Sequence, residues 1–308
     1  MKASENKNGQ ELIKHDLDKY IAELTDKYFP EGEIKTFDNH IVLFSTPEFK
    51  YEGVAVKKAF NNSASKSLLE KEVETFLKLG KVFDKQEKYK IPELLKYNLL
   101  DGVIVMQRLL GLNAVGKVMS NLTQRDNVIK DISGWISVLH SIDSEEKEYK
   151  VEDTSIYQRF NSFLEHDLVK SPNDQSLLKV KKLLENWSQK TFVSKFSLLQ
   201  GDLSPIHFYF EKDGVYSIDF NGGKYGPVEE DIASFVSNSR YHFINATGSE
   251  EMSEQINESL IDTYSKDNSL ELNKSLPFYV AFFDYMKARI ETDESRPKLN
   301  KIITSLSE

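Results

Sequence analysis

Two aspartates and a histidine are the residues of this chain whose types and spacing could do chemistry. Asp202 follows Gly201 in a short irregular loop, His207 lies just beyond it, and Asp219 comes later, near the end of a β-prone run. Two carboxylates and an imidazole suit a hard divalent cation and the activation of a hydroxyl group. Taken singly, each residue has an ordinary structural interpretation, as a turn residue or a hydrogen-bonded histidine. Only their convergence would make a site.

A β-hairpin is the element that must position these side chains. The β-prone runs Ile206–Phe210 and Val215–Phe220 flank Lys212-Asp213-Gly214, and an Asp-Gly dipeptide is typical of a hairpin turn. Because a hairpin reverses the chain, the loop before its first strand lies beside the end of its second strand. The sequence therefore predicts that both aspartates and the histidine share one region of space.

The same stretch resembles the catalytic core of the aminoglycoside phosphotransferase and choline kinase-like family, a branch of the protein-kinase fold. The matching segments are LLQGDLSPIHFYF, SIDFNGG and GPVEEDIASF, and the last adds a third acid, Asp231, at an expected helix start. Gln200 stands where the family has His, and His207 stands where it has a metal-binding Asn. The resemblance implies that Asp202 accepts or orients the proton of the substrate hydroxyl, that Asp219 binds magnesium and that His207 completes a second metal site.

The resemblance also implies the cofactors: ATP or GTP, with Mg²⁺ or, alternatively, Mn²⁺. An imidazole is a poorer magnesium ligand than an amide oxygen and suits manganese or zinc better. We therefore expect His207 to weaken the second metal site or to shift its metal preference.

Composition limits the class of protein. The 308 residues carry a net charge of −9 and include no cysteine, so disulfides, thiolate catalysis and cysteine-bound zinc are excluded. The acidic balance argues against a nucleic-acid surface. No apolar run is long enough to span a bilayer, and residues 1–10 are polar. We expect a cytoplasmic protein with a small-molecule hydroxyl substrate and neither nucleic acid nor membrane as partner; the oligomeric state stays open.

The first part of the chain reads as a helix followed by a small sheet. Apolar residues recur at helical spacing over Glu11–Tyr28. Three strands are expected at Glu33–Phe37, His40–Ser45 and Gly53–Phe60, with turn signals between them. An antiparallel meander is the natural interpretation.

The third of these strands ends in two lysines and precedes an amphipathic helix over Ser65–Leu79. A lysine at a strand end is more often a solvated charge than a ligand. The resemblance assigns Lys57 to the triphosphate and Glu72 to the lysine as its ion-pair partner. A shift of register would replace them with Lys58 and Glu70.

Two further segments are assigned to the nucleotide by the resemblance. Val103–Leu109 reads as a buried strand and corresponds to the hinge between the lobes, where backbone groups of Met106, Gln107 and Arg108 would face an adenine. Asn39 lies in the expected nucleotide-covering loop, which contains no glycine. A core strand is the alternative interpretation of the hinge segment.

The rest of the chain is predominantly helical. His140, near the end of one apolar helix, is expected to be structural, and Asp174 is a candidate N-cap. The aromatic residues around Asp284 indicate core packing, with a cradle for a cation as the alternative. The expected helices are Asn127–Ile142, Asp174–Lys190, Glu229–Phe243, Ser253–Tyr264 and Leu276–Glu291.

Together these features predict an α+β, bilobal protein-kinase-like fold. A small antiparallel-sheet lobe with its leading helix would occupy residues 1–108 and bind the nucleotide, and a helical lobe with the catalytic loop and the substrate pocket would occupy 109–308. The favoured function is a small-molecule kinase. The alternatives are a nucleotide-binding pseudokinase or scaffold without turnover and a compact atypical protein kinase.

Overall fold

The computed structural model describes residues 33–38, 41–45, 54–58, 63–100, 102–220, 223–290 and 295–307. The predicted helix over Glu11–Tyr28 lies outside these residues. The described residues separate into two compact units. Those up to Gly80 belong with Pro92–Leu110 to the first unit, and Lys81–Ile91 belongs with the residues from Gly111 onward to the second.

The first unit contains a five-stranded antiparallel sheet in the order β1-β2-β3-β6-β5. The predicted meander of the first three strands is confirmed. All of Val103, Ile104 and Val105 are buried, and because successive side chains of a strand point to opposite faces, both faces of β6 are covered. The strands are β1 (Glu33–Asp38), β2 (Ile41–Ser45), β3 (Val54–Lys58), β5 (Leu94–Asn98) and β6 (Val103–Gln107).

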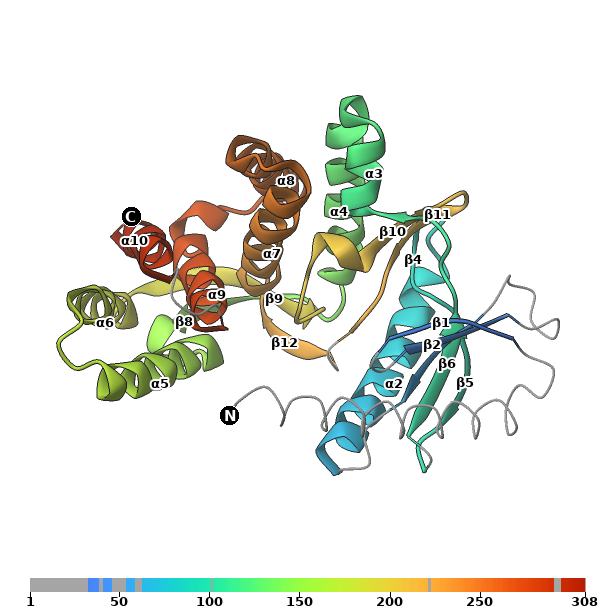
Figure 1. Ribbon diagram of the computed structural model, residues 1–308, viewed down its shortest axis with the longest axis horizontal. Helices are drawn as coiled ribbons and strands as arrows, with labels where there is room; N and C mark the ends of the chain where they lie inside the picture. Colours follow the sequence, from blue (N-terminus) through green and yellow to red (C-terminus); the bar gives the residue numbers. More distant parts are fainter. Residues whose placement is uncertain are drawn as a thin grey trace, which may run out of the picture. The chain divides into compact units, whose positions relative to one another are not determined.

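Helix α2 (Ser63–Phe83) lies beside this sheet, and the boundary between the two units falls within it (Figure 1). Leu69, Val73 and Phe76 are buried at helical spacing, whereas the intervening positions include exposed charged residues. The helix thus has the apolar face that the sequence predicts, and it extends beyond both predicted ends.

The second unit contains two small sheets. One has the order β4-β11-β10-β7 and the other the order β12-β9-β8. Strands β10 (Phe208–Glu211) and β11 (Gly214–Ser217) form the predicted hairpin. The other strands are β4 (Tyr89–Lys90), β7 (Leu112–Asn113), β8 (Glu145–Lys150), β9 (Thr191–Leu199) and β12 (Lys224–Pro227).

The hairpin turn is held by a close approach to β4. Glu211 pairs with Gly214, so Lys212 and Asp213 form the turn and the glycine already belongs to β11. A Cβ atom on Gly214 would lie 2.4 Å from the Lys88 carbonyl oxygen. A glycine is required here because the two backbones nearly touch.

Helices make up most of the second unit, and α7 lies at their centre, packed against α8 and α9 (Figure 1). Asp174 caps α6 as predicted, because its carboxylate accepts the Ser176 and Leu177 N–H groups at 2.9 and 3.2 Å. The helices are α3 (Ala114–Ser120), α4 (Arg125–Leu139), α5 (Ser155–Lys170), α6 (Gln175–Ser188), α7 (Glu229–Thr247), α8 (Glu250–Asn268), α9 (Leu276–Ile290) and α10 (Ser295–Ser307). Short 3₁₀ turns lie at Leu122–Gln124, Val151–Asp153, Pro205–His207 and Leu272–Lys274.

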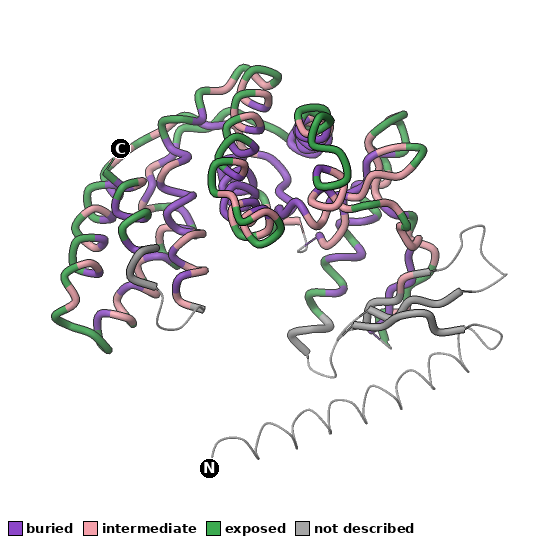
Figure 2. Tube along the Cα trace, turned by 45° about the horizontal axis from the view of Figure 1, so that its top comes forward, coloured by how far each residue is buried: buried purple, intermediate pink, exposed green. Residues whose placement is uncertain are grey.

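An aromatic cluster around Trp135 joins α4 to the open end of the hairpin, at the start of β10 and just after the end of β11. Its ring lies 5.5 Å from that of Phe208 and 6.1 Å from that of Phe220, measured between centroids. Along its helices the chain passes repeatedly between buried and exposed positions (Figure 2). Since Phe220 directly follows Asp219, this packing fixes the end of the second hairpin strand.

Within the described ranges, no helix is both long and apolar enough to cross a membrane.

Candidate active site

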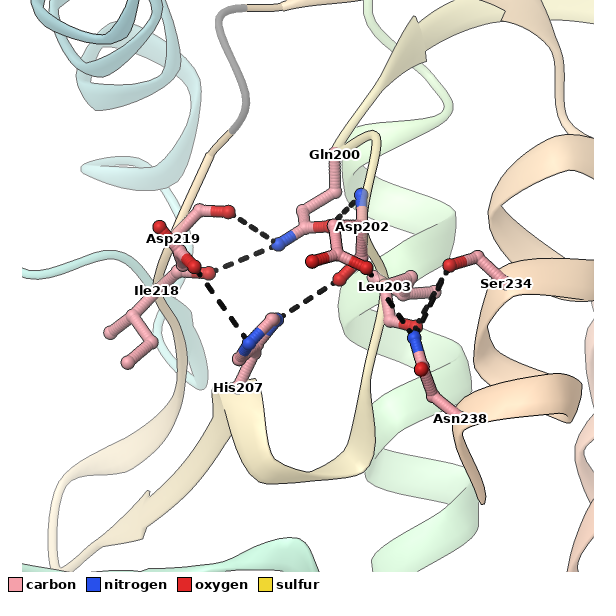
Figure 3. A network of polar contacts seen from close by, with 8 residues as sticks. All are labelled: Gln200, Asp202, Leu203, His207, Ile218, Asp219, Ser234 and Asn238. Atoms are coloured by element: carbon pink, nitrogen blue, oxygen red, sulfur yellow. Dashed lines mark hydrogen bonds and ion pairs between the residues drawn. The ribbon is translucent and has the colours of Figure 1, made fainter. Parts of the chain in front are cut away.

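The open end of the hairpin brings His207 and Asp219 together. The Ile218 N–H donates to the His207 carbonyl at 3.0 Å, one step beyond the last strand pair, Phe208 with Ser217. As a result, His207 Nε2 lies 3.9 Å from Asp219 Oδ2 (Figure 3). The side-by-side arrangement predicted from the sequence is therefore present.

Asp202 lies in the same network and is exposed (Figure 3). Its carbonyl oxygen accepts a hydrogen bond from His207 Nδ1 at 3.0 Å. Because a carbonyl can only accept, Nδ1 carries the proton. In the neutral ring the lone pair is then on Nε2, the nitrogen that faces Asp219.

Gln200 connects the segments that carry the two aspartates, and its side chain is fully buried. Its Nε2 donates to the Ile218 carbonyl at 3.1 Å and to the Asp219 carbonyl at 2.8 Å. Its Oε1 accepts the Asp202 N–H at 2.7 Å. Two carbonyls need donors and one N–H needs an acceptor, so the partners determine the amide orientation. Sequence reasoning noted Gln200 only as a departure from the family pattern. The signal for its structural role was its position, as a polar residue directly after the apolar pair Leu198-Leu199.

Asp219 has a strained backbone conformation, with a φ of 62° in the left-handed region. A non-glycine residue keeps such a conformation only when its surroundings impose it, and such strain is concentrated at functional sites. Here the two carbonyl bonds from Gln200 and the packing of Phe220 hold the backbone on either side. The exposed fraction of the Asp219 side chain is 42%, so its carboxylate stays accessible.

Asp231, the third acid of the motif, is a loop-holding residue rather than an open carboxylate. It is 1% exposed, and its oxygens accept the Gln200 N–H at 2.7 Å and the Gly201 N–H at 2.9 Å. His140 Nε2 lies 3.1 Å from the same carboxylate, and its Nδ1 lies 2.7 Å from the Tyr264 hydroxyl. His140 is thus buried and structural, as the sequence predicts. Asp231 cannot serve as a third ligand without releasing the loop.

The same face of α7 holds the rest of the loop that carries Asp202. Asn238 Nδ2 donates to the Leu203 carbonyl at 2.9 Å and lies 3.5 Å from Asp202 Oδ1, and Ser234 Oγ donates to the Leu203 carbonyl at 3.3 Å (Figure 3). Residues 231, 234 and 238 recur at helical spacing and face the loop together. No sequence signal pointed to Asn238, because its role depends on a segment far away in the chain.

The fit of a divalent cation can be judged from the donors present. The Asp219 carboxylate and the His207 Nε2 lone pair face each other, and an imidazole held by a backbone carbonyl is a common second-shell arrangement. Among the described residues, no group of three or more His, Asp or Glu side chains forms a ready-made metal cluster. The donors therefore suit an ion that completes its coordination with phosphate and water oxygens.

Only some of the residues assigned to the nucleotide have side chains within the described part of the chain. Glu72 is 5% exposed, whereas Glu70 is exposed, so of the two glutamates Glu72 faces the packed side. The backbone of Lys57 pairs with Ile41 and Ile104, but its side chain, like that of Lys58, lies outside the described part of the chain. Asn39 also lies outside it. The ion pair between lysine and glutamate stays a prediction.

One backbone donor of the hinge segment is already in use. Met106 is 9% exposed and Arg108 is half-buried after the end of β6. The Gln107 N–H donates to the Glu93 carbonyl at 2.9 Å. Gln107 therefore uses its backbone donor on Glu93, the residue before β5, and cannot offer that donor to an adenine. The expected contacts of Met106 and Arg108 with an adenine stay a prediction.

Comparison with known proteins gives matches in structure alone. No protein-family model matches the sequence, and no curated protein matches it. The ADP-bound aminoglycoside phosphotransferase APH(2'')-Ib gives a TM-score of 0.58 at 14% identity, over 93% of this chain and 96% of that one. The gentamicin complex of APH(2'')-IIa gives 0.56 at 15% identity, over 94% and 95%. A choline kinase from Cryptosporidium parvum Iowa II gives 0.57 at 12% identity, over 94% of each chain.

Proposed function

Since this chain has the α+β, bilobal protein-kinase-like fold of aminoglycoside phosphotransferases and choline kinases, we propose that it is a small-molecule kinase. It would transfer the γ-phosphoryl group of ATP or GTP to a hydroxyl group. The observation that carries the proposal is the buried Gln200 amide, which ties the Asp202 segment to the Asp219 segment. Phosphoryl transfer depends mainly on positioning and on charge neutralisation, and this arrangement supplies the positioning.

The site residues take the following roles. The exposed Asp202 carboxylate accepts or orients the proton of the acceptor hydroxyl. Asp219 and His207 hold Mg²⁺ or Mn²⁺, which when bound neutralises charge on the phosphates. On the nucleotide side, Lys57 contacts the phosphates, Glu72 pairs with Lys57, and the remaining contacts come from Asn39, Met106 and Arg108.

A small acceptor is favoured over a polypeptide. Only the segment 220–223 separates Asp219 from β12, and α7 follows two residues after the end of β12, at Glu229. A long activation segment, which would dock a polypeptide substrate, has no place in such a short connection.

A pseudokinase is the second candidate, favoured by His207 in the position of the family's metal-binding Asn. The other departure from the family pattern, Gln200 in the position of His, does not favour a pseudokinase. Gln200 makes three hydrogen bonds that hold both aspartates in place, so losing the family's His has not loosened the site.

Nucleotide binding and turnover together test the proposal. We expect Mg-ATP or Mn-ATP to raise the melting temperature and to be consumed when hydroxyl compounds are added. Asp202→Ala is the control, expected to bind nucleotide but to transfer no phosphate. Binding without consumption across a broad panel would favour the pseudokinase, and phosphate on a protein would favour the compact protein kinase.

A further inference from the structure

A cavity of about 410 Å³ lies within the second unit, on the opposite side of α7 from the loop that carries Asp202. Val236 and Arg240 line the cavity, whereas Ser234 and Asn238 contact that loop. Positions two apart on a helix differ by about 200° around its axis, so the two pairs point in nearly opposite directions. The cavity is therefore separate from the candidate active site, and its volume is typical of small-molecule pockets.

Much of the cavity lining is apolar. Val236 of α7 and Leu276 and Val280 of α9 line it and are buried. Ile261 of α8 and Pro277 of α9 complete this lining and are half-buried. Because moving apolar surface out of water is favourable, such a lining favours a ligand with an apolar body.

The acidic part of the lining comes from one face of α8. Glu254, Asn257 and Glu258 line the cavity at positions i, i+3 and i+4, so their side chains are neighbours on the helix surface. Both glutamates are exposed, and neither forms a hydrogen bond or an ion pair with another described residue. Two carboxylates without a partner in the described part of the chain thus border the cavity.

Asn257 supplies a second, independent observation. It is 4% exposed, and its Nδ2 donates to the Val236 carbonyl at 3.3 Å. Its Oδ1 is buried and has no hydrogen-bond partner among the described residues. A buried acceptor without a donor is unfavourable, so a ligand N–H group would be stabilised at this oxygen.

The basic residues at and beside the cavity are already paired with acids. Arg240, the basic residue of the described lining, donates from Nη1 to Asp284 Oδ2 at 2.6 Å. The neighbouring ion pairs on the surrounding helices and turns are Lys301 with Glu250, Lys274 with Glu271 and Arg125 with Asp126. Among the described side chains, Glu254 and Glu258 therefore remain as uncompensated negative charge.

From this arrangement we propose that the cavity binds a primary amine with an apolar body, in its protonated form. A primary ammonium group has three N–H donors, and Glu254, Glu258 and the Asn257 Oδ1 atom offer three acceptors. A quaternary ammonium has no N–H group for Asn257, and an anion would face two carboxylates. The proposal concerns a site apart from phosphate transfer, and it does not depend on the kinase function.

The test is direct binding to the full chain, measured by calorimetry and by thermal unfolding with three probes that share one apolar body. Phenethylamine is the primary amine, its N,N,N-trimethyl analogue keeps the charge without N–H groups, and its N-acetyl derivative keeps an N–H group without the charge. No probe carries a hydroxyl group, so none can replace the acceptor of a kinase. At equal ionic strength, phenethylamine should raise the melting temperature and bind about tenfold more tightly than either analogue.

Variants connect the binding to this cavity. Glu254→Gln and Glu258→Gln each remove one charge at an exposed position, and each should weaken phenethylamine binding about threefold. The double variant should weaken it about tenfold. Asn257→Leu removes the buried acceptor at similar volume and should reduce the preference over the trimethyl analogue. Glu185→Gln is the matched control, since Glu185 is exposed on α6 and does not line the cavity.

The outcomes decide the proposal even where Asn257→Leu fails to fold. Equal affinity for the three probes would overturn it, as would a double glutamate variant that binds phenethylamine like Glu185→Gln. An ammonium group could also be attracted to Asp202 and Asp219, so the variant carrying Asp202→Asn and Asp219→Asn is measured as well. Unchanged binding in that variant supports the cavity, and lost binding would overturn it. Failure to bind nucleotide would overturn the kinase function and leave this test unaffected.

Discussion

Replacing Gln200 by methionine should uncouple the two aspartates while keeping the core filled. Methionine has nearly the volume of glutamine, but it can neither donate to the carbonyls of Ile218 and Asp219 nor accept the Asp202 N–H. The wild-type bonds are 3.1, 2.8 and 2.7 Å long. Removing the partner of a buried polar group costs about 1 to 3 kcal/mol, and these partly buried groups belong at the lower end. We therefore expect a loss of about 3 kcal/mol in the free energy of unfolding.

The catalytic consequence should exceed the loss of stability. Asp219 is held at a φ of 62° by the bonds that the variant lacks, so its carboxylate should relax away from Asp202. A misplacement of about 1 Å at a reacting centre can lower the rate about a hundredfold. Acceptor-dependent phosphate transfer measures this loss at a temperature well below the unfolding transition, and urea denaturation measures the stability.

Two further variants make the experiment decisive. Gln175→Met changes an exposed glutamine on α6 in the same way and should alter neither quantity. Gln200→His introduces an imidazole that can donate one bond and accept another, so it should recover part of both losses. A Gln200→Met protein with unchanged urea midpoint and unchanged transfer rate would refute the claim that this amide holds the site together.

Three other predictions follow from the described contacts. His207→Asn should shift the metal preference of transfer from Mn²⁺ toward Mg²⁺, measured as the ratio of rates with the two ions; an unchanged ratio would remove His207 from the metal site. Burial raises the pKa of Glu229 from 4.5, so the folded state prefers the protonated acid and stability falls as pH rises above that value. In urea titrations, the free energy of unfolding of Glu229→Gln should therefore equal that of the wild type below pH 4.5 and exceed it increasingly as the pH rises. A difference that does not change with pH would contradict this. Asn238→Ala should raise KM for the acceptor more than KM for ATP, because Asn238 positions only the Asp202 loop; equal changes would argue against that role.

Local sequence patterns were sufficient for most of the elements that carry the site. An Asp-Gly dipeptide between two β-prone runs predicted the hairpin, and helical spacing of apolar residues predicted α2, α4, α6 and α7. Strand β8 escaped this reasoning, because EEKEYK is mostly charged and exposed and owes its strand conformation to pairing with β9. A strand held mainly by its neighbour leaves little trace in its own residues.

The sequence by itself determined that two aspartates and a histidine would meet at one end of a hairpin, since chain reversal is a local property. Only the tertiary structure decided which side chains hold them there. Gln200 reaches the carbonyls of Ile218 and Asp219, Asp231 accepts the N–H groups of the loop, and Asn238 reaches the Leu203 carbonyl from α7. These contacts join residues far apart in the chain, and the spacing of residues along one segment carries no information about the partner that packing will bring to it.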